Sequence, residues 1–142
     1  PGFLIGPDAE KDGTILHGTQ AVLACTESTV PWSTIMIRKS FGVAAAAHYG
    51  PDGYVLAWPS SESGPLPLEG GVAVAFKKEI AAAKDPEAKR KELESKMAKN
   101  QNPFPKAEAF SVHEIIDPRE TRKYLSLWSE RIQQQLKASL IK

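Results

Sequence analysis

The chain has 142 residues, of which 42% are hydrophobic and 25% charged, the composition of an ordinary globular domain. Eighteen basic against seventeen acidic residues leave a net charge near +1, which argues against nucleic-acid binding. The single cysteine, Cys25, excludes an intramolecular disulfide, and no apolar run is long enough to cross a membrane.

The N-terminal segment predicts a helix. Residues 7–28 show a helical pattern in which Asp8 can cap a first turn and a face forms after Gly13. We expect Cys25, inside this run, to be a small buried side chain. The predicted face consists of Ile15, Thr19, Val22 and Thr26.

Two strands and a short helix follow. Residues 34–37 and 54–58 are short, largely apolar runs, which predicts strands covered on both faces. Between them, residues 40–42 predict a tight turn, and residues 43–48 contain four consecutive alanines, the best helix former. The local order is therefore strand, turn, short helix.

The middle of the chain predicts a loop and two further helices. Residues 60–71 are rich in Gly, Ser and Pro, which favours a loop that could shape a site. Residues 71–83 resume a helical pattern, and Asp85 with the following proline opens a charged helix that extends to Lys99. The Pro-rich segment 102–105 ends it.

The C-terminal segment predicts one strand and a last helix. Residues 112–116 favour a strand, and Asp117 with Pro118 forms a helix N-terminus. Strands separated by helices, without hairpin turns, indicate an α/β fold. We expect a buried stripe on the last helix, formed by Leu125, Trp128, Ile132, Leu136 and Leu140.

The most informative segment for chemistry is residues 37–46. A strand that turns through Gly42 into a helix presents backbone N–H groups at the helix N-terminus, where they can hold an anion. The small side chains around it would let a substrate approach the backbone. Tight packing of the helix against a sheet is the alternative explanation of the same residues.

Other constellations are weaker. His17, His48 and His113 have no metal-ligand spacing, and we expect each to be exposed or hydrogen-bonded. The sequence contains no recognisable nucleophile elbow and no dinucleotide fingerprint. These patterns favour neither acyl-enzyme chemistry nor a resident metal.

Five segments together resemble one family, the carboxyltransferase subunits of biotin-dependent acyl-CoA carboxylases, in their C-terminal domain. They occur in the family's order over the whole chain: Pro1-Gly2-Phe3 with Gly6, residues 13–31, Ile37-Arg38-Lys39 through Ala44, Leu56-Ala57-Trp58-Pro59, and Ile116-Asp117-Pro118-Arg119-Glu120-Thr121-Arg122. The group contains the propionyl-, acetyl- and methylcrotonyl-CoA enzymes.

The resemblance implies a crotonase-like fold of stacked ββα turns, with residues 1–142 forming the C-terminal portion of the domain. The N-terminal, CoA-binding half would be absent, in keeping with a start at Pro1 rather than Met. The implied reaction is transfer of a carboxyl group from carboxybiotin to the α-carbon of an acyl-CoA. We expect the 142 residues alone to be inactive.

The resemblance also implies the site. Backbone N–H groups of Val43 and Ala44 would form an oxyanion hole for the biotin ureido oxygen. Many relatives have Gly where this chain has Val43, and residues 63–70 also depart from propionyl-type relatives, so substrate identity does not transfer. The residues implied to bind biotin or substrate are Gly2, Phe3, Gly6, Lys39, Phe41, Gly42 and Ala46.

The implied partners are the N-terminal carboxyltransferase half, a biotin carboxylase and a biotin carboxyl carrier, assembled as a trimer of dimers. The implied location is the cytoplasm, or the mitochondrial matrix in a eukaryote. No metal, nucleic acid or membrane is expected. Two alternatives stay open: a biotin-dependent decarboxylase or transcarboxylase subunit, and a non-catalytic interaction domain that retains the fold.

Overall fold

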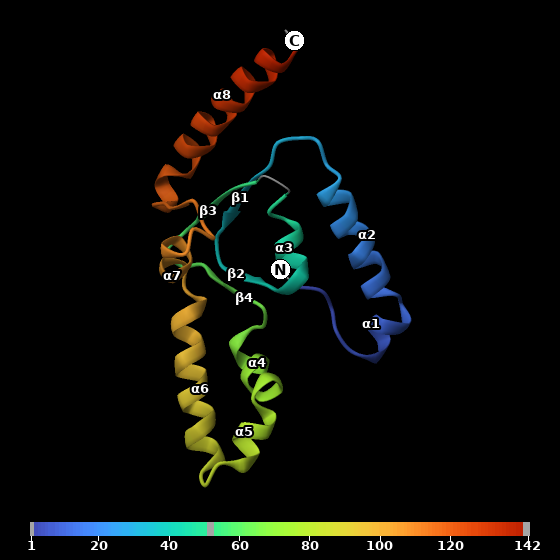
Figure 1. Cartoon of the computed structure of the whole chain (residues 1–142), viewed down its shortest axis with the longest axis vertical. Coiled ribbons are helices and arrows are strands. Elements are labelled where there is room, and N and C mark those ends of the chain that lie inside the picture. Colours follow the sequence, from blue (N-terminus) through green and yellow to red (C-terminus); the bar gives the residue numbers. More distant parts are fainter. Residues whose placement is uncertain (1, 51–52, 141–142) are drawn as a thin grey trace.

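The computed structural model describes residues 2–50 and 53–140, with elements labelled in Figure 1. The helices are α1 (Pro7–Lys11), α2 (Thr14–Thr26), α3 (Gly42–Ala47), α4 (Leu68–Ala75), α5 (Lys77–Ala82), α6 (Pro86–Gln101), α7 (Pro103–Glu108) and α8 (Thr121–Ser139), and a 3-10 turn, η1 (Pro118–Glu120), precedes the last. The strands are β1 (Ser33–Met36), β2 (Lys39–Phe41), β3 (Tyr54–Ala57), β4 (Glu62–Gly64) and β5 (Glu114–Ile115).

The strands form two small parallel sheets. One has the order β1-β3-β5, and the other pairs β2 with β4. The chain thus makes one strand–strand–helix turn, β1-β2-α3, and a second, β3-β4-α4, whose strands lie beside those of the first. This arrangement confirms the predicted α/β class and shows the stacked ββα turns.

The core lies around the central strand β3. Val55, Leu56 and Ala57 are all buried, with Leu56 and Ala57 at 0% exposure, which confirms that this strand is covered on both faces. Met36 and Val112 pack in the same cluster as Val55 and Ala57. The apolar run at residues 54–58 predicted this burial, because a strand that is covered on both faces contains consecutive apolar residues.

Strand β1 corrects one expectation. Of its residues only Met36 is buried, and Ile37, which follows the strand, is 51% exposed. Strand β1 is an edge of its sheet, so only one of its sides is paired. An apolar run predicts that a strand forms, but not whether another element packs over its side chains.

The N-terminal helix is interrupted, which the pattern did not predict. Gly13 has a φ of 75° and separates α1 from α2. Gly6, rather than Asp8, occupies the N-cap position of α1, and no side chain caps it. Ile15 is 71% exposed, so the predicted face of α2 is partly open to solvent, and Cys25 is only half-buried, so its predicted burial is wrong.

Two segments predicted as turn and loop contain short strands. Residues 39–41 form β2 and residues 62–64 form β4, paired in register from Lys39 with Glu62 to Phe41 with Gly64. Gly, Ser and charged residues have low strand propensity, so the pairing depends on the neighbouring chain rather than on local preference.

The helices after this point follow the sequence more closely. Asp85 caps α6 by accepting a hydrogen bond from the Ala88 N–H at 3.0 Å, as predicted. The single helix expected over residues 71–83 is instead two, α4 and α5, because Phe76 leaves the helical conformation (φ −116°, ψ 21°). Asn102 ends α6 and caps α7 by accepting from the Phe104 N–H.

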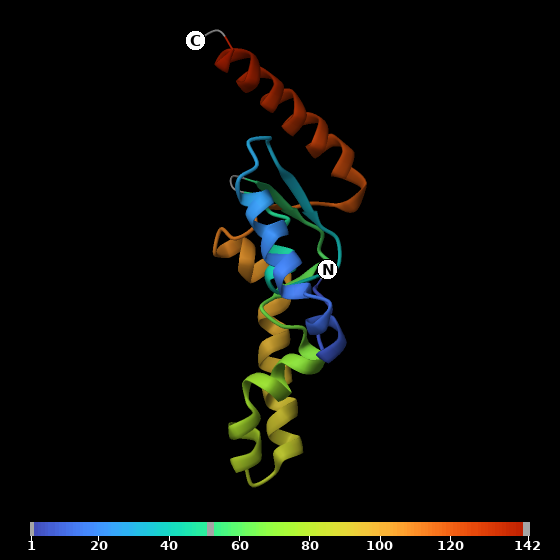
Figure 2. The same ribbon diagram turned by 90° about the vertical axis from the view of Figure 1, so that its right-hand side faces the viewer.

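Helix α8 projects from the rest of the molecule (Figures 1 and 2). Asp117 accepts a hydrogen bond from the Arg119 N–H, as a residue at a helix start does, which confirms the predicted start. The predicted buried stripe is wrong for this chain, because no α8 residue is buried and Leu136 and Leu140 are 48% and 85% exposed. No helix of residues 2–50 and 53–140 has the length and hydropathy that a membrane crossing requires.

Candidate active site

The turn between β2 and α3 has the geometry of an anion-holding helix start. Phe41 is extended, with φ −126° and ψ 146°, and Gly42 follows with a φ of 68°. Only glycine adopts such a φ without strain, which explains its presence here. The first N–H groups of a helix have no partner within the helix, so those of Val43 and Ala44 remain available.

Side chains around this turn divide into two groups. Ala44 and Ala45 are 4% and 3% exposed, whereas Val43 is 63% exposed and Ala46 is also exposed. The buried pair packs α3 against the sheet, as the packing alternative required. The exposed pair leaves the turn open, so the structure accommodates both explanations.

A pocket of about 280 Å³ lies beside α3. Its lining includes Gly42, Ala45 and Ala46 on the helix side and Ser63 and Lys106 on the opposite side. Mostly apolar surface with a few polar groups is typical of a small-molecule site. Of the residues predicted from the sequence, Gly42 and Ala46 are thus placed together here.

A second, smaller hollow of about 160 Å³ separates α3 from α2. Val43 and Ala46 line it from α3, and Val22 and Cys25 line it from α2. The Val43 side chain therefore faces α2, and Ala46 borders both spaces.

The remaining predicted residues lie around this centre. The Phe3 ring packs on Gly18 of α2, where an added Cβ would meet the ring at 2.7 Å. Gly6 has a φ of 115° at the start of α1. Lys39 begins β2 with an exposed side chain, whereas Phe41 is only 8% exposed and lines neither of these two hollows.

The sequence patterns missed two polar residues that line the pocket, Ser63 and Lys106, and Gln101, whose main-chain oxygen accepts from Lys106. Ser63 and Gln101 are each 6% exposed, and the Lys106 ammonium lies between them. A buried glutamine at the end of a charged helix has no distinctive local pattern. The one usable signal was the Pro-rich break at 102–105, which turns the chain back toward β4.

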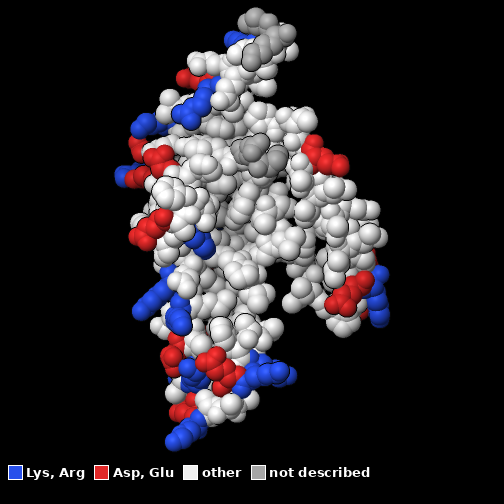
Figure 3. All heavy atoms as spheres, in the orientation of Figure 1, with Lys and Arg blue, Asp and Glu red and all other residues white. Residues whose placement is uncertain are grey.

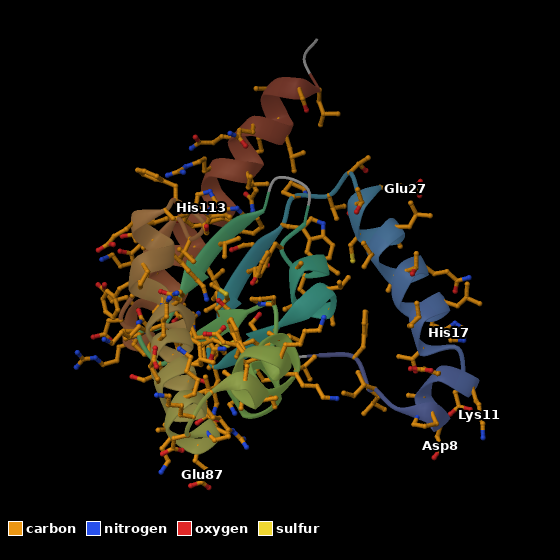
Figure 4. All side chains as sticks on the ribbon, turned by 60° about the horizontal axis from the view of Figure 1, so that its bottom comes forward. Asp8, Lys11, His17, Glu27, Glu87 and His113 are labelled. Atoms are coloured by element: carbon orange, nitrogen blue, oxygen red, sulfur yellow. The ribbon has the colours of Figure 1, made fainter. Side chains whose placement is uncertain are left out.

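The histidines behave as predicted. His113 Nδ1 lies 3.1 Å from the Val55 nitrogen, and His48 Nδ1 lies 2.6 Å from the Ala44 oxygen. Figure 4 places His17 on α2 and His113 beside the sheet, far from a common site. Among the described residues, no cluster of His, Cys, Asp and Glu could hold a metal ion.

Charged residues gather away from the centre. Figure 3 shows Lys, Arg, Asp and Glu along the left flank and at the lower and right-hand edges, while the middle of this face, around α3, is largely uncharged. A weakly charged, hollowed surface is the kind that another protein surface or a ligand covers.

Comparison with known proteins identifies the family. Residues 1–141 match the carboxyl transferase domain. The chain is 38% identical over 130 residues to the carboxyltransferase subunit of propionyl-CoA carboxylase from Haloferax mediterranei, covering 88% of this chain and 25% of that protein. It is equally similar, 38% over 130 residues, to the methylmalonyl-CoA carboxyltransferase 12S subunit of Propionibacterium freudenreichii, covering 89% and 25%. The chain thus spans about a quarter of the length of these relatives.

Solved structures agree with this assignment. Transcarboxylase 12S, solved as a hexamer assembly with methylmalonyl-coenzyme A and methylmalonic acid bound, superposes with a TM-score of 0.81 at 37% identity, covering 94% of this chain and 26% of that one. The geranyl-CoA carboxylase β subunit of P. aeruginosa, at 24% identity and a TM-score of 0.76, shares the fold. The chain belongs to the carboxyl transferase domain family and has its crotonase-like fold.

Proposed function

We propose that this chain is the C-terminal part of the carboxyltransferase subunit of a biotin-dependent acyl-CoA carboxylase. The whole subunit would transfer a carboxyl group from carboxybiotin to the α-carbon of an acyl-CoA. The observation that carries the proposal is the glycine turn between β2 and α3, which opens beside a pocket within a carboxyltransferase fold.

The residues at this turn fit a biotin-type ligand. Gly42 has no side chain to cover the backbone, and Ala46 is small and exposed. When bound, carboxybiotin would supply the carboxyl group that is transferred. Val43 and Ala44 would hold, through their N–H groups, the negative charge that develops on an oxygen during transfer, which is worth most when the donors are already in place.

The other predicted contacts have supporting roles in this proposal. Gly2, Phe3 and Gly6 would shape the path of the ligand near α2. Lys39 and the Phe41 backbone would line the next part of that path, along β2. Ala46 would lie beside the acyl chain. The position of Ala46 on the border of two hollows supports this part of the proposal.

The open edge of β1 supports the proposed domain boundary. A preceding ββα turn of the same kind would pair with the open edge of β1, as β3 pairs with its other edge. Residues of that turn would also cover Ile37. We expect the N-terminal carboxyltransferase half to supply this turn. Residues 1–142 would then be the C-terminal portion of the domain.

The proposed assembly includes a biotin carboxylase, a biotin carboxyl carrier and further copies of the subunit in a trimer of dimers. The hexamer reported for transcarboxylase 12S supports the oligomer. We place the protein in the cytoplasm, or in the mitochondrial matrix of a eukaryote, by analogy with the mitochondrial propionyl-CoA carboxylase β chain of Rattus norvegicus.

A transcarboxylase or decarboxylase subunit is the second candidate function. It is favoured by the equal similarity, 38% identity, to the 12S subunit of P. freudenreichii and to the methylmalonyl-CoA decarboxylase α subunit of Propionigenium modestum. All three functions share the same half-reaction with biotin, so the C-terminal portion does not separate them.

The proposal is tested with the full-length subunit. Free carboxybiotin and a series of acyl-CoA esters should yield carboxylated acyl-CoA, whereas the purified 142 residues should yield none. Product from the 142 residues alone would contradict the proposal that the active site also needs the N-terminal half. Copurification with a biotin carboxylase would favour the carboxylase, and copurification with a membrane pump partner would favour the decarboxylase. No transfer by the full-length subunit in any direction would overturn the proposal.

A further inference from the structure

The pocket beside α3 has two walls of different origin. Gly42, Ala45 and Ala46 of α3 form one wall, and residues 63–65, at the end of β4 and the start of the next loop, form the other. A Cβ added to Gly42 would stand 3.6 Å from the Pro65 carbonyl oxygen, which is ordinary van der Waals contact. The walls therefore approach each other closely at this end, and a small displacement of residues 63–65 would change the space next to α3.

The second wall is held from behind by Lys106 of α7. Its ammonium donates to the main-chain oxygen of Ser63, to the Ser63 hydroxyl at 2.6 Å and to the Gln101 carbonyl at 3.1 Å. An ammonium has three hydrogens, and these three acceptors use all of them. Lys106 thus joins the start of α7 and the end of α6 to the residue of β4 that lines the pocket.

Gln101 extends the same network by one residue. Its side-chain amide donates to the Leu66 carbonyl at 3.0 Å, so the loop that follows Ser63 is held as well. Both Ser63 and Gln101 are buried, and among the described residues no buried side-chain nitrogen or oxygen lacks a partner. A fully satisfied polar network of this kind fixes one arrangement of the segments that it joins.

The charge of Lys106 is not explained by an ion pair. In the described parts of the chain, its hydrogen-bond partners are two carbonyls and a hydroxyl, and no carboxylate forms a salt bridge with it. Burial lowers the pKa of Lys106 from its ordinary value, which shows that the site disfavours the charged form. An apolar side chain would fill the same volume without this cost, so a purely space-filling role does not account for a lysine here.

We infer that Lys106 is a positioning residue that sets the distance between the β4 wall and α3, and thereby decides which acyl group the pocket admits. The inference rests on the proposed function, because it concerns the acyl-CoA that the same site would accept. The substrate class that follows is an acyl-CoA with an uncharged chain, since all three ammonium hydrogens are already used within the protein and none is left for a substrate carboxylate.

The test compares acyl-CoA esters of different length in the full-length subunit. Lys106→Met keeps the length of the side chain but removes the ammonium, so residues 63–66 lose their anchor. We expect the ratio of kcat/KM for octanoyl-CoA to that for acetyl-CoA to change by about tenfold or more, since a single methylene of clearance is worth ~10- to 200-fold. A role in stability alone would lower both rates by the same factor and leave the ratio unchanged.

Two matched variants complete the experiment. Lys96→Met removes an exposed lysine from α6 and should leave the ratio at its wild-type value. Ser63→Ala removes the hydroxyl acceptor and keeps the main-chain acceptor, so it should change the ratio in the same direction by a smaller factor. An unchanged ratio in a folded Lys106→Met subunit overturns the inference. If that subunit is not recovered folded, an unchanged ratio in Ser63→Ala overturns it instead.

The wild-type assay separates the two levels of the proposal. If the wild-type subunit carboxylates none of the esters, the proposed function fails and this inference falls with it. If the wild type is active and the Lys106 and Ser63 variants keep its selectivity, only the positioning role of Lys106 is refuted.

Discussion

The turn between β2 and α3 packs against its own chain through Ala44 and Ala45, whereas helix α8 leaves the body of the molecule and keeps much of its apolar face open. Ala44 and Ala45 are almost fully buried, while Leu136 and Leu140 at the end of α8 are 48% and 85% exposed. The turn is held between the sheet and residues 63–65, which lie across the pocket.

Within the described chain, the hydrogen bonds from α8 to other elements lie in its first turns, and further along the helix Ile132 and Gln135 border a hollow shared with residues 28–32. The Trp58 indole N–H donates to the Thr121 hydroxyl at 2.9 Å, and the Tyr124 hydroxyl donates to the Glu114 carboxylate at 2.6 Å. Beyond these contacts its apolar face lacks a full partner within the described chain. The residues of this chain thus hold the turn in place but do not cover the apolar face of α8.

The largest effect should come from removing one N–H group at the turn. Ala44→Pro in the full-length subunit removes one proposed donor, and loss of such a donor costs ~100- to 1000-fold in turnover. An early helical position tolerates proline better than the middle of a helix. Turnover of carboxybiotin and acyl-CoA is the measurement, with the melting temperature as the control for folding.

Ala44 is buried, so the proline ring could also disturb packing. An ester in place of the amide between Val43 and Ala44 removes the same N–H group without adding a ring. Near-normal turnover in a folded ester variant would remove the oxyanion role from this turn.

The second effect concerns the space beside the turn. Ala46→Ile adds bulk where α3 borders both hollows, so we expect longer acyl groups to lose kcat/KM relative to acetyl by ~10- to 200-fold. Ala82→Ile, at an exposed position of α5, serves as the matched control. Equal ratios in the wild type and the Ala46 variant would place the acyl chain elsewhere.

Two glycines test how tightly the region around the turn is packed. A Cβ on Gly53 would stand only 1.5 Å from the Tyr49 carbonyl oxygen, so Gly53→Ala should destabilise the fold by ~1–3 kcal/mol or more. Gly70, inside α4, has no atom within 4 Å of an added Cβ, and Gly70→Ala should stabilise by up to ~1 kcal/mol. Denaturant unfolding of both variants measures the difference, and a destabilised Gly70→Ala protein would contradict the predicted order.

The open face of α8 should make the 142-residue chain self-associate. Replacing Leu136 and Leu140 by Lys should weaken this association about tenfold or more, since burying one leucine contributes ~1.5–3 kcal/mol. Lys at Gln133 and Gln134 adds the same charge at exposed polar positions and is the control. Sedimentation at several concentrations is the measurement, and a monodisperse wild-type monomer would contradict the expectation.

The smallest effect is at the start of α8. Hydrogen bonds from the Arg119 side chain, and then from its backbone, lower the pKa of Asp117 to about 2 from 3.8. A carboxylate with a lowered folded-state pKa stabilises the fold above 3.8 and loses that contribution as the pH falls from 3.8 to about 2. Asp117→Asn should flatten the pH dependence of the free energy of unfolding, and only between pH 3.8 and about 2.

The Asp117 contribution is small because the pair with Arg119 is largely exposed to solvent. Urea unfolding of the wild type and the variant at several pH values between 2 and 5 would measure it. Identical pH dependence in the two proteins would show that the carboxylate charge does not contribute.

Local signals predicted those elements whose residues interact with near neighbours in the chain. The caps at Asp85 and Asp117 form as expected, and the alanine run forms α3. The three-residue apolar run of β3 is buried as its pattern indicated. These features depend on hydrogen bonds and side chains within a few residues, which a sequence shows directly.

Contacts between distant segments were not predictable in this way. Strands β2 and β4 contain few strand-forming residues, and they form because each pairs with the other. The hydrogen bond from the Lys106 ammonium to the Ser63 hydroxyl joins residues 43 positions apart in the chain. No periodicity marks either feature, since both depend on which segments the fold brings together.

The sequence by itself determined the α/β class, the family resemblance and the glycine turn that carries the candidate site, because these depend on residue type and local order. The tertiary structure alone decided that β1 is an edge, that α8 lacks a full partner and that Lys106 holds the second wall of the pocket. The physical reason is that an apolar pattern states which face favours burial, while only the arrangement of the whole chain determines what covers it.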